Sequence, residues 1–311
     1  MLSEAASNVG RYHSRFGGLW TDRGDWDVEL AQRVGQQRIA TDVAALIPGF
    51  VRDGFVILSR GAEAAAIDAF QDKIARSFRE GNERLLYQVP GSHQPLPVSA
   101  GLERRGTRIV DAYAVMPEAR QLFASARLMS FLTAIFDEEP LLFQSLSFDQ
   151  GSEQGLHQDT AYVVVDQPLE LCACWIALQD VVPGSGELMY VPGSHRFPDF
   201  DFSGKKHWSP VEDGDAKHHE WARWIYAQTE SRGLSIQRFL PRRGDIFIWH
   251  ADLAHGGSPI TDPSLSRQSL VGHFCPSRRR PHYFSYAPQR ATVQAYGKLR
   301  YSSFHYDLAV P

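Results

Sequence analysis

The chain has 311 residues, a formal net charge of -4, 43% hydrophobic residues and 22% charged residues. This balance is typical of a globular protein and excludes disordered and fibrous classes. Charges of both signs are interspersed without a basic block, so no nucleic-acid partner is expected, and no apolar run approaches the roughly 20 residues of a membrane span.

The first fifty residues are polar and aromatic-rich, and we expect them to form an extension that wraps onto the rest of the chain. The opening segment, MLSEAASNVGRYHSRF, lacks the charged and apolar regions of a secretory signal peptide. Cys172, Cys174 and Cys275 are a sparse, odd set that is typical of reduced thiols, and we interpret the first two as buried small side chains on one face of a strand. These features predict a cytoplasmic protein.

Helices and one short strand are predicted before residue 140. Residues 56–58 resemble a buried strand, and residues 62–78 carry apolar side chains at the spacing of one helix face. Residues 81–107 show no period and are interpreted as a long loop. A second helix is expected over 117–136, because its first residue is a proline. Residues 1–140 are therefore predicted to be an N-terminal extension and helical support.

Short strand-like runs follow one another after Pro140, separated by turns with glycine and proline. They lie at 141–148, 161–165, 171–178, 187–193, 244–250 and 269–274. Many short strands of this kind are typical of an antiparallel sandwich or barrel. An insertion at about 197–235 contains a helix-like stretch with His218 and His219 expected on its exposed face. We predict one domain, 1–311, with a mainly β core at 141–275, flanking helices and a C-terminal segment at 276–311.

The tripeptide His157-Gln158-Asp159 is the strongest candidate for a metal site. Residues two apart on a strand face the same way, so one imidazole and one carboxylate would project together. Oxygenases hold iron(II) with two histidines and one carboxylate on one face of an octahedron. His255, which follows a predicted strand and precedes two glycines, is the expected third ligand, because glycine would let the backbone turn the side chain inward.

An arginine follows this candidate triad at the start of the next predicted strand. Arg267 can clamp a carboxylate with two parallel hydrogen bonds, and Ser269, on the same strand face, can add a hydroxyl donor. This pair suits 2-oxoglutarate, whose keto acid end would chelate the iron. Other arginines (Arg104, Arg105, Arg108 and the run 278–280) could meet an acidic substrate, although such charge clusters are usually solvated.

A second His-x-Asp pair offers a competing metal assignment. His250 and Asp252 are followed by His282 and Arg290, but only about 30 residues separate the carboxylate from that histidine. This separation is short for crossing a barrel, and the pair lies on the strand end that would deliver His255. We therefore interpret His250 as a packing or supporting residue.

The second half of the chain resembles the phytanoyl-CoA dioxygenase family of iron(II)- and 2-oxoglutarate-dependent oxygenases. The resemblance rests on residues 143–162, 174–195 and 244–258, together with Arg267 and Ser269. It implies a double-stranded β-helix, the jelly-roll core of cupin-like proteins, with the triad at its open end. It also implies that Gln144 helps to bind the co-substrate and that Trp175 lines the site.

The resemblance further implies a reaction that uses Fe(II), 2-oxoglutarate and O2 to hydroxylate an unactivated C–H bond of a small molecule. Halogenases of this fold replace the carboxylate by a small residue, so Asp159 favours hydroxylation, while desaturation and cyclisation need the same cofactors. The alternatives are a non-catalytic jelly-roll binding protein and a cupin-type metalloenzyme without 2-oxoglutarate. Substrate choice is expected to depend on residues 81–110, 197–235 and 276–290.

Overall fold

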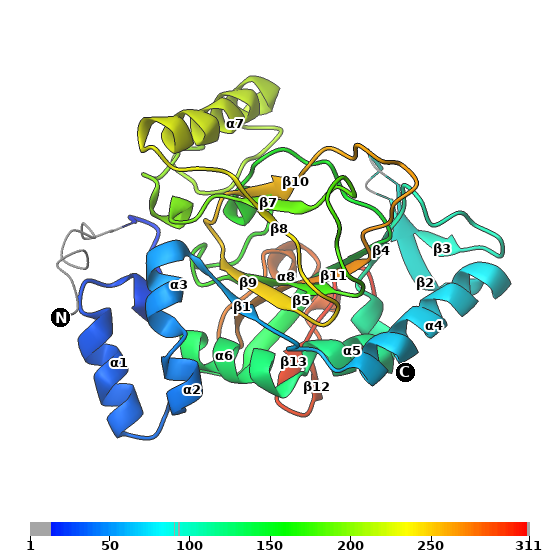
Figure 1. Cartoon of the computed structure of the whole chain (residues 1–311), viewed down its shortest axis with the longest axis horizontal. Helices are drawn as coiled ribbons and strands as arrows, with labels where there is room; N and C mark the ends of the chain where they lie inside the picture. The colour runs from blue at the N-terminus through cyan, green and yellow to red at the C-terminus, as the bar shows by residue number, and fades with distance from the viewer. Residues whose placement is uncertain (1–13, 90, 93, 310–311) are drawn as a thin grey trace.

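The protein is described by a computed structural model that covers residues 14–89, 91–92 and 94–309 (Figure 1). Most of the opening segment that we compared with signal peptides lies outside these residues. Three helices, α1 (Trp26–Gly35), α2 (Thr41–Ala44) and α3 (Ile47–Asp53), precede the first strand, β1 (Phe55–Leu58). They pack on the body of the protein, where the Trp20 indole donates a hydrogen bond to the Ala134 carbonyl at 2.9 Å.

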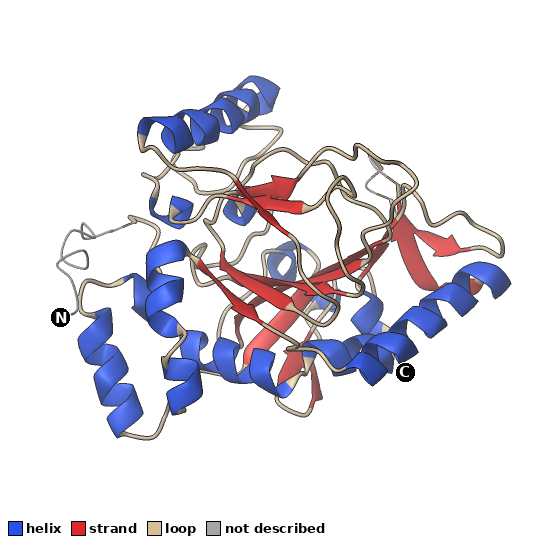
Figure 2. Cartoon of the chain, viewed as in Figure 1, coloured by secondary structure: helices blue, strands red, loops and turns tan. Residues whose placement is uncertain are grey.

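Three further helices lie along one face of the main sheet, as Figure 2 shows. The helix α4 (Ala64–Glu80) confirms the predicted amphipathic segment. The helix predicted for 117–136 is instead two helices, α5 (Pro117–Phe123) and α6 (Ala126–Phe136). The break has a local cause, because the Ser125 side chain caps α6 by accepting a hydrogen bond from the Leu128 amide.

The prediction of a long loop over residues 81–107 is wrong. It contains the strands β2 (Asn82–Gln88) and β3 (Leu96–Val98), and β2 also pairs with β4 (Arg108–Val110). Leu85 and Val98 are buried beneath this hairpin, while the charged residues that hid the strand pattern lie on its exposed side. The segment therefore extends the main sheet beside the barrel.

Two antiparallel sheets face each other to form the core. The larger sheet is centred on β5 (Pro140–Phe148), β11 (Ser269–Pro276), β6 (Cys172–Ala177) and β9 (Ile246–His250), adjacent in that order. The smaller sheet has β10 (His255–Gly257), β7 (Leu188–Tyr190) and β8 (Gln237–Phe239), and a backbone bridge from His157 to His255 extends it. This arrangement is a double-stranded β-helix. Its neighbouring strands come from parts of the chain that lie far apart in the sequence.

Side chains alternate between the two faces of β6, and each face packs into a different hydrophobic core. Cys172, Cys174 and Ile176 face the helices, whereas Ala173, Trp175 and Ala177 face the interior of the barrel. The three cysteines are buried and unpaired, and burial raises the pKa of the Cys174 thiol, in line with their predicted role as small hydrophobic side chains. On β11, Gly272 is needed because a Cβ there would lie 2.5 Å from the Phe123 ring of α5.

The remaining segments surround the barrel. The run 161–165 is not a strand, because its valines pack instead on the C-terminal segment, and only Val165 forms a bridge, to Pro281. The insertion carries α7 (Gly214–Ser231), seen above the smaller sheet in Figure 1. The chain ends with α8 (Tyr283–Tyr286) and the hairpin β12 (Gln294–Tyr296) and β13 (Leu299–Tyr301), which joins β5 in parallel. Within the described residues, no helix is long and apolar enough to cross a membrane.

Candidate metal centre and co-substrate pocket

His157 and His255 are brought together by the backbone of the smaller sheet. Each residue's amide donates to the other's carbonyl, at 2.8 and 2.9 Å, so the two rings lie with centroids 4.4 Å apart. Asp159 does not continue a strand as expected but begins a 3-10 turn over Asp159–Ala161. The turn still directs its carboxylate to the same point, and within the described residues these three side chains form the one group able to hold a metal ion.

The ligand atoms of this triad converge closely. The Oδ1 atom of Asp159 lies 3.9 Å from His157 Nε2 and 3.6 Å from His255 Nε2. Each histidine has its Nδ1 atom 2.9 Å from a backbone carbonyl, that of Gly155 for His157 and that of Leu253 for His255. These contacts favour the tautomer that leaves Nε2 free as a metal ligand.

The glycines after His255 have a different role from the one predicted. Neither has a positive φ, so conformational freedom is not what they provide. A Cβ on Gly256 would lie 2.5 Å from the Gln154 carbonyl, and a Cβ on Gly257 would lie 2.9 Å from the Glu153 amide. The glycines are required because the segment before His157 crosses directly over β10.

The second carboxylate oxygen of Asp159 is held by two residues that the sequence interpretation missed. The Trp249 indole donates to Oδ2 at 2.8 Å, and His273 Nε2 lies 3.5 Å from the same oxygen. Both come from predicted strands, and the alternation of β9 and β11 could have revealed their inward orientation. Their contacts leave Oδ1 facing the histidines.

Burial and charge set the protonation of this group. Burial lowers the pKa of His157 to about 4, with a further contribution from His255. Burial opposes ionisation of Asp159, but His255 and His273 outweigh it and hold the pKa of that carboxyl well below its usual range. A neutral imidazole beside an ionised carboxylate is the state that binds a metal cation.

A cavity of about 430 Å³ opens in front of the triad. Its walls include Arg108, Gln144, Tyr162, Trp175, Trp249, Arg267 and His273. The cavity therefore combines aromatic side chains with polar and charged groups that converge on the triad, as a small-molecule site requires.

Arg267 and Ser269 lie where a dicarboxylate could bind. Arg267 is 3% exposed, has no carboxylate within ion-pair distance among the described residues, and lies 5.6 Å from the centroid of the Trp175 ring. Burial lowers the pKa of its guanidinium to about 10. Arg267 Nε, Ser269 Oγ and Trp175 Nε1 are buried without a hydrogen-bond partner in the described chain. Unsatisfied buried donors are costly, so this group fits a bound anion such as 2-oxoglutarate.

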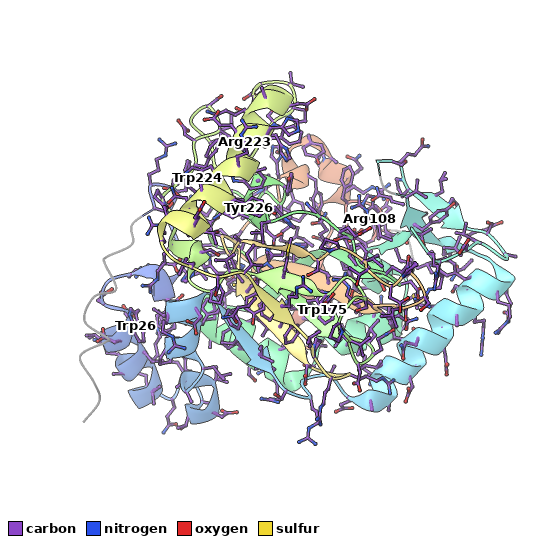
Figure 3. All side chains as sticks on the ribbon, turned by 45° about the horizontal axis from the view of Figure 1, so that its top comes forward. Trp26, Arg108, Trp175, Arg223, Trp224 and Tyr226 are labelled. Atoms are coloured by element: carbon purple, nitrogen blue, oxygen red, sulfur yellow. The ribbon has the colours of Figure 1, made fainter. Side chains whose placement is uncertain are left out.

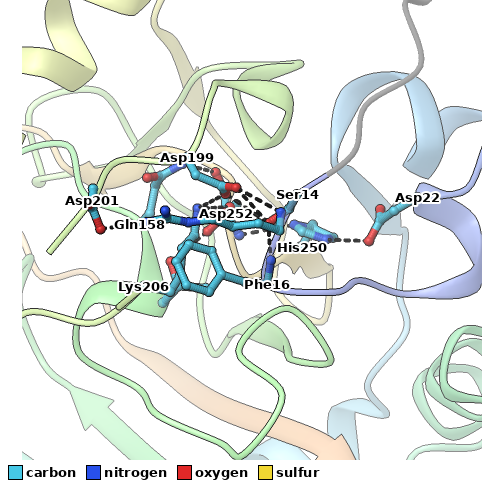
Figure 4. A network of polar contacts seen from close by, with 11 residues as sticks. Ser14, Phe16, Asp22, Gln158, Asp199, Asp201, Lys206, His250 and Asp252 are labelled. Atoms are coloured by element: carbon cyan, nitrogen blue, oxygen red, sulfur yellow. Dashed lines mark hydrogen bonds and ion pairs between the residues drawn. The ribbon is translucent and has the colours of Figure 1, made fainter. Parts of the chain in front are cut away.

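The competing pair, His250 and Asp252, belongs to a buried ion network and not to a metal group (Figure 4). His250 Nε2 lies 3.2 Å from an Asp22 carboxylate oxygen. The Asp252 carboxylate pairs with Lys206 at 2.6 Å and accepts a hydrogen bond from the Thr160 hydroxyl at 2.6 Å. The backbone carbonyl of Asp252 accepts a hydrogen bond from the side-chain amide of Gln158 at 2.8 Å. Asp252 therefore holds both neighbours of Asp159.

Of the segments predicted to govern substrate choice, 81–110 contributes Arg108 to the lining of the cavity, and the described residues of 197–235 and 276–290 do not line it. The insertion helix α7 contacts this lining through His218, whose Nε2 lies 2.6 Å from the Tyr162 hydroxyl; His218 is thus half-buried, and only His219 is exposed as predicted. Figure 3 shows Arg108 near the strands β2 to β4, with Trp175 at the sheet. The run 278–280 has a structural role, because Arg278 and Arg279 pair with Glu170 at 2.5 and 2.6 Å.

Solved structures of other proteins share this fold. EctD from S. alaskensis superposes with a TM-score of 0.54 and 20% identity, over 78% of this chain and 79% of that one. The carbocyclase SnoK from nogalamycin biosynthesis gives a TM-score of 0.55 with 14% identity, over 79% and 87%. The epimerase SnoN, solved with Fe3+, alpha ketoglutarate and nogalamycin RO, gives 0.54 with 18% identity, over 77% and 86%. The fold is thus that of the double-stranded β-helix oxygenases.

The family follows from the sequence match. Residues 50–269 match the family described as Phytanoyl-CoA dioxygenase (PhyH), and the chain belongs to this family of iron- and 2-oxoglutarate-dependent oxygenases. Phytanoyl-CoA dioxygenase 1 of Oryza sativa subsp. japonica is 27% identical over 161 residues, which are 50% of this chain and 52% of the rice protein. The chain therefore spans about half the length of this relative. The family match and the fold confirm the resemblance stated above, and with it iron and 2-oxoglutarate as the cofactors of the family.

Proposed function

We propose that this chain hydroxylates an unactivated C–H bond of a small organic molecule, with 2-oxoglutarate and O2 converted to succinate and CO2. The observation that carries the proposal is the buried, unpaired guanidinium of Arg267 in the same cavity as His157, Asp159 and His255. A non-catalytic barrel would have no use for a buried cation beside a convergent metal triad.

The metal ligands in this proposal are the Nε2 atoms of the two histidines and Oδ1 of Asp159. When bound, iron(II) supplies the activation of O2 and the oxidative decarboxylation of 2-oxoglutarate. The Trp249 indole keeps Oδ2 engaged, so the carboxylate would offer Oδ1 to the metal. Because Asp159 occupies the position that halogenases leave empty, hydroxylation is favoured over halogenation.

The co-substrate contacts come from the larger sheet. Arg267 would clamp the distal carboxylate of 2-oxoglutarate with two parallel hydrogen bonds, and the Ser269 hydroxyl would add a third. Gln144 and Trp175, which both line the cavity, are proposed to contact the same molecule. Trp175 and Arg267 are themselves buried, and low exposure to water strengthens polar contacts of this kind.

Substrate-triggered succinate release tests this function. Small organic compounds are incubated with iron(II), 2-oxoglutarate and O2, and an active compound should accelerate succinate release and gain one oxygen atom. His157→Ala should abolish the release, while His219→Ala, an exposed histidine on α7, should not change it. A product that loses two hydrogens, or changes only its stereochemistry, would replace hydroxylation by desaturation, ring closure or epimerisation.

A further inference from the structure

Arg108 is the second cation in the walls of the cavity, and its charge has no carboxylate partner among the described residues. The residue lies in β4, half-buried, and its Nε atom donates to the Gln88 side chain at 3.2 Å. Burial lowers the pKa of the guanidinium, and no neighbouring carboxylate counteracts this effect. Asp159 is the one acidic side chain among the described residues that line the cavity.

The other two arginines of this cluster are held by protein groups that do not line the cavity. Arg104, four residues earlier, pairs with Asp149 at 3.4 Å, and Arg105 donates to the Pro263 carbonyl at 2.6 Å. Arg104 and Arg105 are thus directed away from the cavity, whereas Arg108 lines it and has the neutral Gln88 side chain as its hydrogen-bond acceptor.

The charges of the loaded site leave this cation unmatched. The proposed iron(II) and Arg267 carry as many positive charges as Asp159 and the 2-oxoglutarate dianion carry negative ones, because metal-bound histidines are neutral. Arg108 then remains as the uncompensated positive charge in a partly desolvated cavity, where an anionic group would bind it favourably.

The sheet register separates Arg108 from the co-substrate contacts. Phe148 of β5 pairs with Arg108 on one side and Ser269 on the other, so two strand spacings, roughly 10 Å, divide the two backbones. Arg108 lies in the same row of the sheet as Ser269, while His273, beside Asp159, lies four residues along β11, roughly 13 Å away. A small molecule anchored at Arg108 could therefore extend toward the metal without occupying the place of 2-oxoglutarate.

We propose that Arg108 binds a carboxylate of the substrate, so that this oxygenase acts on small organic acids; the inference rests on the function proposed above. A carboxylate is the group that a single guanidinium matches best, with one charge and two coplanar oxygens. The cavity of about 430 Å³, shared with 2-oxoglutarate, limits the substrate to a compact molecule.

Ligand-observed NMR tests the proposal without turnover. The chain is loaded with Zn(II) and saturating 2-oxoglutarate, and carboxylic acids are compared with their amides, benzoate with benzamide and cyclohexanecarboxylate with its amide. Phenyl phosphate provides a phosphate arm. In the wild type at least one acid should bind roughly tenfold more tightly than its amide. Arg108→Gln should remove this preference and Arg108→Lys should keep part of it, whereas Arg105→Gln should leave it intact.

Several outcomes would overturn the proposal. One is that every acid binds as tightly as its amide. Another is that Arg108→Gln still binds the acid more tightly than the amide. A third is that phenyl phosphate binds more tightly than any of the acids. A loss of 2-oxoglutarate affinity in Arg108→Gln would assign the residue to the co-substrate instead. A failure of the proposed function itself is seen separately, because the wild type would then form no visible charge-transfer band with iron(II) and 2-oxoglutarate under anaerobic conditions.

Discussion

Replacing Arg267 by methionine separates its binding role from its cost to the fold. Arg267 is 3% exposed and has no carboxylate within ion-pair distance among the described residues, so in the unliganded protein it is a buried cation that the more distant Glu187 offsets in part. Removing one partner of a buried charge pair costs about 2–5 kcal/mol of binding free energy. Arg267→Met should therefore weaken 2-oxoglutarate binding by roughly 30-fold to several thousandfold, at about 1.4 kcal/mol for each factor of ten.

The same substitution should raise the stability of the unliganded protein, because an apolar side chain of similar length replaces the isolated charge. At 100 times its dissociation constant, 2-oxoglutarate should stabilise the wild type by about 2.7 kcal/mol, or roughly 4 °C in Tm for a chain of this length. At that concentration the variant should gain about 0.9 kcal/mol or less. Titration and thermal denaturation with Fe(II) present measure both effects. Binding within about threefold of the wild type would refute the assignment of Arg267.

Three further predictions concern the residues that support the site. Trp249→Phe, which removes the hydrogen bond to Asp159, should weaken Fe(II) binding roughly 10- to 100-fold in a metal titration; unchanged affinity would contradict the role of the indole. Lys206→Met should cost about 3–5 kcal/mol of unfolding free energy, with partial recovery when Asp252→Asn is added, and an additive double variant would contradict their pairing. Burial lowers the pKa of His195 to about 3, so only the unfolded state gains this proton as the pH falls below 6.5. Stability should therefore fall between about pH 6.5 and 3, and denaturant titration of His195→Gln should show a shallower fall.

The barrel and its site were predictable where one local pattern decides the structure. Short β-rich runs between turns identified the strands β5, β6, β9 and β11, and the spacing of His157, Asp159, His255 and Arg267 gave the constellation that the cavity brings together. The strand prediction is confirmed because a strand buried on both faces must be apolar, and the candidate residues could be chosen because such a site needs few residue types.

The errors arose where tertiary contacts override local pattern. The strand β2 begins with polar residues and was interpreted as loop, yet it pairs with β3 and β4 at the edge of the sheet. The valines at 163 and 165 have strand propensity but are buried against the C-terminal segment. Trp249 and His273 were within reach of the alternation argument, since each lies on the inner face of a predicted strand. The half-burial of His218 depends on a contact with Tyr162, 56 positions away, that no local pattern indicates.

The central claim is that His157, Asp159 and His255 hold iron(II) beside 2-oxoglutarate. The most direct measurement is the anaerobic visible spectrum of the chain with both added. A weak metal-to-ligand charge-transfer band is expected in the wild type and should be absent in His157→Ala. A wild type without the band, or a His157→Ala variant that keeps it unchanged, would contradict the claim.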